Sequence, residues 1–288
     1  MQWFRSARSL LKQTFKEWND DDVPRLGAAL AFYAVFSIAP MLVLTLELAG
    51  WLFGEKAVSG ELERTMRDLL GPAAAGAVQS IVREAGEGND FTLIGAFMLI
   101  FGASAVLAQF RETMNIIWNV TPRREGFMKF IVNRSIAVVL VPCFVLLLIF
   151  MGGATTAISV MGSSLDVFGG ALVWRLVDLL TSFVVLTFAF SLILKYTPSV
   201  NLTWKDVLAG GSLTSFLFVA GKSVLSYYLA RGSTASAYGA AGSLVILLIW
   251  IFYSAQIVFF GSEFTQVYAR SRGSHAPGTN QEPVAEDE

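Results

Sequence analysis

The sequence predicts an all-α membrane protein: a polytopic bundle of about six transmembrane helices, with an N-terminal interfacial helix and an extracytoplasmic helical hairpin. Composition is the first observation. Hydrophobic residues make up 55% of the 288 positions and charged residues only 15%, whereas a soluble domain carries about 25% charged residues. The mean hydropathy of +0.59 is the second, because a domain of this size exposes a large area to its solvent. That solvent is predicted to be lipid.

Six apolar stretches approach the ~20 residues that a helix needs to cross a bilayer. They cover residues 26–52, 91–110, 135–158, 173–194, 207–228 and 241–264. Helix is the open-chain structure that satisfies every backbone polar group in lipid, so each stretch is predicted to be a helix. Pro40 and Pro142 lie within two of the stretches and are predicted to kink the first and third helices.

The chain outside the spans divides into three further parts. Residues 1–25 have apolar positions on one helical face and basic positions on another, which is typical of a helix in the membrane interface, followed by a linker. The membrane domain covers residues 26–270 and includes the loop 54–90, where leucines at helical spacing precede Gly71-Pro72 and predict a helical hairpin. The tail 271–288 is rich in Gly, Pro and acids and is expected to be disordered.

Orientation follows from the Lys and Arg residues that flank the spans. Alternate segments, counted from the N-terminus, hold fourteen of these residues and the opposite set holds five. Because basic residues accumulate on the cytoplasmic side, both termini are predicted to be cytoplasmic.

Residue types that support common enzyme chemistry are scarce. The one histidine, His275, lies in the tail, and the one cysteine, Cys143, lies in an apolar run. A His-based metal site, a catalytic triad and an internal disulfide are therefore not expected, and no phosphate-binding Walker sequence occurs. We expect no enzyme activity, no metal and no cofactor. A net charge of −1 also gives no reason to expect a nucleic-acid partner.

Polar side chains at membrane depth are the candidate site residues, because such groups are costly in lipid and point to function. They are Glu47, Arg175, Asp178 and Lys222 near the extracytoplasmic ends, and Arg111, Glu112, Asn115 and Glu263 near the cytoplasmic ends. For Arg111, Glu112, Arg175 and Glu263, snorkelling to the interface is the preferred interpretation. Arg175 and Asp178 can pair within one helix. Glu47 and Lys222 lie at similar predicted depth on different helices, so they could form an ion pair across the bundle. A functional role for this pair and no role beyond being tolerated remain equal alternatives.

Several motifs resemble the YihY/BrkB family of bacterial inner-membrane proteins. They are the run 25–40, Asn115-Ile116-Ile117-Trp118, the small-residue run 236–243, Trp250 and Gly261-Ser262-Glu263. Ser262 departs from the expected Ala. The resemblance implies a six-helix protein of the bacterial inner membrane. The family once carried the label ribonuclease BN and has been associated with serum resistance and with movement of lipid or lipopolysaccharide precursors.

Three functional hypotheses follow. The first is a transporter or flippase-like protein for an envelope lipid or other amphipathic anionic substrate, with Lys222, Arg175 and Arg111 contacting phosphate. The second is a non-transporting scaffold that binds membrane lipids and envelope proteins, or a second copy of itself. The third is a ribonuclease, which the sequence supports poorly, because Asp20-Asp21-Asp22 is better interpreted as a helix-start cap than as a metal site.

Overall fold

A computed structural model describes residues 2–35, 93–120, 170–198, 200–231 and 242–272, together with positions 67, 72, 75, 76 and 79. Every regular secondary-structure element in these ranges is a helix. They are α1 (Gln2–Asp20), a short helix Val23–Val35, α5 (Leu93–Ile117), α7 (Gly170–Tyr196), α8 (Trp204–Arg231) and α10 (Gly242–Arg272). The all-α prediction is confirmed for this part of the chain.

Three of these helices contain apolar segments long enough to cross a membrane: Leu179–Tyr196, Trp204–Leu225 and Gly242–Ser271. They overlap the predicted spans 173–194, 207–228 and 241–264. Helix α5 begins close to the start of the predicted span 91–110 and continues to Ile117. Several predicted features lie outside the described residues. They are the span 135–158, most of the span 26–52, the kinks at Pro40 and Pro142, almost all of the hairpin, and the tail. The total of six spans therefore stays a prediction.

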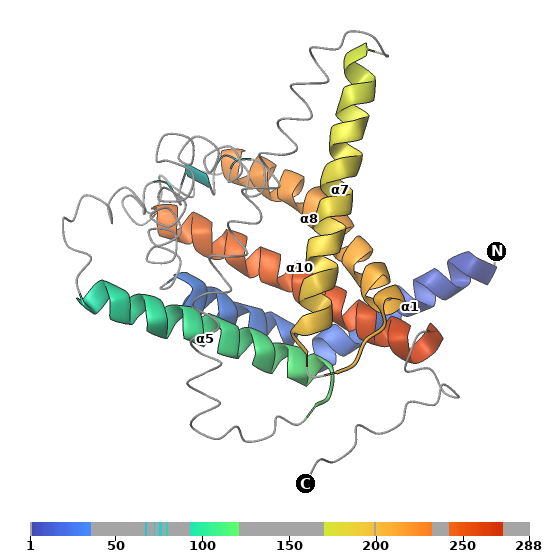
Figure 1. The fold of residues 1–288 in the computed structure, drawn as a ribbon, viewed down its shortest axis with the longest axis horizontal. Coiled ribbons are helices and arrows are strands. Elements are labelled where there is room, and N and C mark those ends of the chain that lie inside the picture. Colours follow the sequence, from blue (N-terminus) through green and yellow to red (C-terminus); the bar gives the residue numbers. More distant parts are fainter. Residues whose placement is uncertain are drawn as a thin grey trace.

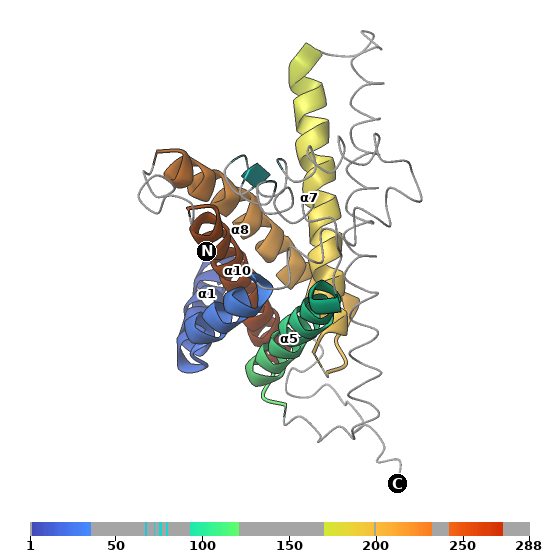
Figure 2. The same cartoon turned by 90° about the vertical axis from the view of Figure 1, so that its left-hand side faces the viewer.

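Helix α10 is the central element of the described structure, because it contacts α1, α5, α7 and α8. Helices α8 and α10 run side by side, and α7 crosses them steeply (Figures 1 and 2). Helix α1 packs along the C-terminal part of α10 and lies opposite α7. The outward faces of α7, α8 and α10 carry exposed large apolar side chains, among them Leu180, Val184, Phe216, Val224 and Phe252. This is the surface that a lipid-facing bundle presents.

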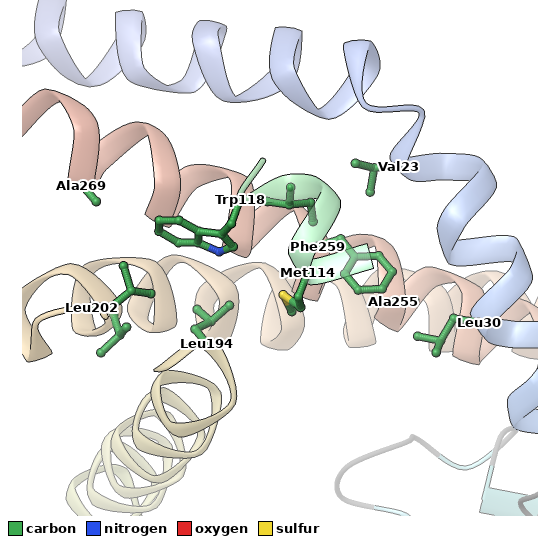
Figure 3. Packing of buried hydrophobic residues seen from close by; sticks show 11 residues of the cluster. Val23, Leu30, Met114, Trp118, Leu194, Leu202, Ala255, Phe259 and Ala269 are labelled. Carbon is green, nitrogen blue, oxygen red and sulfur yellow. The ribbon is translucent and has the colours of Figure 1, made fainter. Parts of the chain in front are cut away.

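The best-packed core lies where several helix ends meet. It joins Val23 after α1, Met114 and Trp118 at the end of α5, Leu194 at the end of α7, Leu202 before α8, and Phe259 and Ala269 in α10 (Figure 3). The ends of α5, α7 and α10 and the start of α8 therefore lie at the same end of the bundle. These are the ends that the sequence assigns to a single side of the membrane from their basic flanks.

Local sequence explains how α8 begins at this end. Thr203 Oγ1 donates a hydrogen bond of 2.6 Å to Asp206 Oδ2, and the Thr203 amide donates one of 3.3 Å to the same oxygen. In return the Asp206 amide donates to the Thr203 carbonyl at 3.1 Å. The carboxylate of Asp206 thus reaches back to the amide of Thr203, which is one half of a capping box. The two hydrogen bonds from Thr203 also give the fully buried Asp206 side chain polar partners.

Candidate functional site: an acid pair

The turn between α1 and the following helix directs one of its three aspartates inward. Asp22 adopts φ 53, and its carbonyl accepts hydrogen bonds from the amides of Arg25 at 2.9 Å and Leu26 at 3.3 Å. Its exposed carboxylate lies 3.5 Å from Arg25 Nη2. A helix therefore starts directly after Asp22, at the place that the helix-start interpretation predicts. The environment of Asp21 is different. Its Oδ2 is buried and meets no hydrogen-bond donor among the described residues.

Glu263 of α10 is the group that Asp21 faces. Its side chain is 0% exposed, and no donor from the described part of the protein reaches either of its carboxyl oxygens. The polar group that it does meet is the Asp21 carboxyl, which lies within hydrogen-bonding range. The snorkelling interpretation of Glu263 is therefore wrong. Helix α1 and its turn cover the position and leave the carboxyl group no route to the interface.

Polar contacts continue on both sides of Glu263 along α10. Trp118 Nε1 of α5 donates a hydrogen bond of 3.2 Å to Ser262 Oγ, and Gln266 Nε2 donates to the Ile117 carbonyl at the end of α5. The other amide atom of Gln266, Oε1, is buried and meets no donor in the described structure. Together Ser262, Glu263, Thr265 and Gln266 form a buried polar segment of α10, which we call the α10 polar segment. It fastens α10 to α5 and to the N-terminal turn.

The charges around Asp21 mostly disfavour its ionised form. Burial raises the pKa of the Asp21 carboxyl above its ordinary value, and the neighbouring carboxylates of Glu17 and Asp20 add to the increase. The hydrogen bond with Glu263 and the charge of Arg270 act in the opposite direction but do not cancel the effect of burial. An acid that is disfavoured as a charge tends to keep its proton.

The other predicted site residues do not gather around this pair. Arg111 and Glu112 are exposed, as the snorkelling interpretation requires, and Asn115 and Lys222 are half-buried. The backbone of α7 includes Arg175 and Asp178, but their side chains and the whole of Glu47 lie outside the described residues. The proposed Glu47–Lys222 pair therefore stays a prediction.

Sequence reasoning missed Asp21 and Gln266. A signal for Asp21 was present in the spacing of α1: Leu10, Thr14, Trp18 and Asp21 follow one another at intervals of three or four residues, and Thr14 is fully buried. Residues at that spacing share one helical face. The face that packs on α10 could therefore have been extended to the turn. Gln266 lay in a polar stretch that resembled an ordinary helix end.

No group of three or more His, Cys, Asp or Glu side chains within the described ranges is arranged to hold a metal ion. The acid pair thus offers two carboxyl groups and an adjacent amide oxygen. Chemically, such a pair can accept and release a proton.

Comparison with known proteins places this architecture in a family. The family model described as Virulence factor BrkB matches residues 14–286. Curated relatives called UPF0761 membrane protein include those of Alkalilimnicola ehrlichii, 29% identical over 280 residues, and Tolumonas auensis, 29% identical over 259 residues. The matches cover 93% and 86% of this chain, and 60% and 81% of the relatives. The chain thus spans little more than half the length of several relatives, that of Teredinibacter turnerae included at 60%.

No solved structure matches the chain. The family match covers nearly the whole sequence, and the relatives are named as membrane proteins, in agreement with the three membrane-length helices. The resemblance inferred from the motifs is confirmed, and the chain belongs to the BrkB family of membrane proteins.

Proposed function

We propose that this protein moves an amphipathic, anionic envelope lipid across the bacterial inner membrane, with both termini in the cytoplasm. The observation that carries the proposal is Glu263: a fully buried carboxyl group without a donor among the described residues, inside a helix of membrane-spanning length. Ionisable residues at such positions are costly and are typical of substrate pathways and proton relays in transporters.

The charges at the same end of the bundle support an anionic substrate. Arg111, Lys205 and Arg270 are exposed on three different helices whose ends meet there, close to the core described above. Lys195 lies 5.2 Å from the centre of the Trp204 ring and donates a hydrogen bond of 2.7 Å to the Leu202 carbonyl. Basic and aromatic side chains of this kind lie at the headgroup level of the cytoplasmic leaflet in membrane proteins.

The test is a flux assay on purified protein in liposomes that contain fluorescent phosphatidylglycerol, with dithionite added outside to destroy the accessible fluorophore. Transport makes the inner-leaflet lipid accessible, so the signal should fall below the level left by empty liposomes. Glu263→Gln should slow this loss severalfold, and Asp22→Asn, an exposed acid outside the pair, should not. Equal quenching with and without protein for phosphatidylglycerol and for other anionic lipids would count against transport.

A scaffold without transport is the second candidate, and one observation favours it. Helices α8 and α10 are packed so closely that a Cβ atom at Gly210 or Gly261 would overlap the facing threonine. Helices in such close contact do not slide easily along each other. Co-purification of a defined set of envelope proteins, combined with absent lipid flux, would support the scaffold instead.

Orientation is tested separately. A cysteine introduced at Ser271, in a chain whose Cys143 has been replaced by serine, should react with a membrane-impermeant maleimide only after the cells are broken. Labelling of intact spheroplasts would reverse the proposed topology.

A further inference from the structure

The fully buried carboxyl group of Glu263 meets the half-buried carboxyl group of Asp21, whose Oδ2 is buried. This contact requires a particular protonation state. An ionised carboxylate can only accept hydrogen bonds, so Asp21 and Glu263 can share one only when one of them carries a proton. With both groups ionised, two like charges would face each other where little water screens them. One of the two must therefore be neutral for α1 and its turn to stay packed on α10.

The surrounding charges do not supply a substitute for that proton. On α1 the nearby groups are the acids Glu17 and Asp20, and on α10 the nearby cation is Arg270, which is exposed. The ionisable side chains that α5, α7 and α8 place at this end are engaged elsewhere or exposed: Lys195 bonds the Leu202 carbonyl, Asp206 accepts from Thr203, and Arg111, Glu112 and Lys205 are exposed. No cation from these elements neutralises the pair directly.

We propose that Asp21 and Glu263 form a single proton-binding site that fastens the N-terminal helix to α10. With the proton bound, the two carboxyl groups share a hydrogen bond and α1 stays docked. When the proton leaves, like-charge repulsion separates the turn from α10 and frees α1 toward the membrane surface. The site does not depend on the proposed transport function, since it requires only these two groups.

The proton is a better occupant than a metal cation. The pair offers two carboxyl groups, and no group of three or more His, Cys, Asp or Glu side chains among the described residues is arranged to hold a metal ion. Arg270 also contributes positive charge at this place, which disfavours the arrival of a second cation.

The direction of the pH effect follows from Asp21. Its pKa is raised on folding by burial, so the docked state binds the proton more tightly than the undocked state does. Docking is therefore strongest while the pair holds its proton, and it weakens as pH rises past the point at which the pair releases that proton. For one proton the docking equilibrium changes by at most about tenfold per pH unit.

The experiment combines two measurements on the whole protein in lipid nanodiscs. Infrared difference spectra between acidic and alkaline pH should show a protonated-carboxyl band that disappears as pH rises. Hydrogen exchange of the α1 amides, corrected for the intrinsic effect of pH, should accelerate over the same interval, by up to about tenfold per pH unit.

Three variants decide the assignment. Glu263→Gln and Asp21→Asn each replace one of the two like charges by a neutral amide, so each should keep α1 protected at every pH. Glu263→Gln should also abolish the band. Asp22→Asn, a neighbouring exposed acid, should leave both signals as in the unmodified protein. Where Glu263→Gln does not fold, Asp21→Asn carries the test, because Asp21 lies at the edge of the bundle.

Other results would overturn the proposal. A band that persists in both amide variants would assign the proton to a different group. Absence of the band, together with carboxylate bands that shift on adding sodium or calcium, would make the site a cation site. If α1 protection depended on pH in the same way in all variants, the proton on this pair would not be what holds α1 on α10.

Discussion

Gly210 of α8 lies directly against the hydroxyl group of Thr265 in α10, and Gly261 of α10 lies in the same way against Thr214 of α8. Each threonine hydroxyl donates to the glycine carbonyl four residues earlier in its own helix, at 2.8 Å for Thr214 and 2.6 Å for Thr265. The hydroxyl groups are thus satisfied within their helices. Two antiparallel helices therefore approach closely through a reciprocal glycine–threonine contact, as small residues allow in membranes.

Replacing Gly210 with alanine should destabilise the bundle by about 1–3 kcal/mol, the usual cost of an added methyl group in a close-packed core. The new Cβ would overlap Thr265 Oγ1 and approach the Gly261 carbonyl. Unfolding in sodium dodecyl sulfate, followed by the loss of helical circular dichroism, measures the change. Gly76→Ala is the matched control, since a Cβ there meets no described atom within 4 Å.

A second substitution tests the cause of that loss. Thr265→Ala added to Gly210→Ala removes the overlapping atom and should recover part of the stability. If Gly210→Ala alone unfolds like the unmodified protein, the close approach of α8 and α10 is wrong.

Ser262→Ala should cost about 0.6 kcal/mol, the average measured for hydrogen bonds between membrane helices, and at most about 1.7 kcal/mol. The change removes the acceptor of the Trp118 Nε1 hydrogen bond and loosens α5 from α10. A double-mutant cycle with Trp118→Phe isolates the interaction energy of this hydrogen bond, because Phe keeps an aromatic ring without the donor. A coupling energy of zero would mean that the two side chains only lie near each other.

Val184→Lys should impair insertion by about 2.5–3.5 kcal/mol, the cost of a lysine at the centre of a membrane helix. Val184 is 63% exposed on the outer face of α7, within the segment Leu179–Tyr196. The measurement is the membrane-inserted fraction of α7 in a glycosylation-mapping assay. Tyr196→Lys is the control, because Tyr196 is equally exposed but ends the helix, where lysine can reach water. Equal insertion of both variants would place Val184 away from lipid.

Thermal stability should depend on pH through Asp21. Because burial raises the pKa of Asp21, its contribution is fully present below the ordinary value of 3.8 and is lost as pH rises through the raised pKa. Asp21→Asn should therefore raise the melting temperature at neutral pH and flatten its decrease with pH. Calorimetry in detergent at a series of pH values measures both effects. A lower melting temperature for the variant at neutral pH would contradict the sign.

Sequence was sufficient for the parts of the fold that depend on local composition. The apolar lengths of α7, α8 and α10 locate these helices to within several residues, because backbone hydrogen bonding in lipid permits little else. The helix start after Asp22 followed from residue type in the same way. The ends of the helices were predicted less accurately than their positions. Helix α5 continues to Ile117, beyond the predicted span, because Met114, Ile117 and Trp118 pack into the common core.

The site could not be predicted from spacing alone because it depends on a tertiary contact. Depth along α10 suggested that Glu263 could reach the interface, but depth does not reveal which neighbour covers a side chain. Coverage by α1 is decided by the face containing Leu10 and Thr14, and this face turns Asp21 inward. The charge pattern of α1 instead drew attention to its exposed basic residues.

The contact between the N-terminal turn and α10 also has a consequence for biosynthesis. Gln256 Nε2 reaches the Pro24 carbonyl, at 3.4 Å, across 232 positions of sequence, and Asp21 and Glu263 lie even farther apart in sequence. Helix α1 therefore completes its packing only after α10 has been synthesised. A chain that stalls before α10 therefore leaves the face of α1 that contains Leu10 and Thr14 without the helix on which it packs.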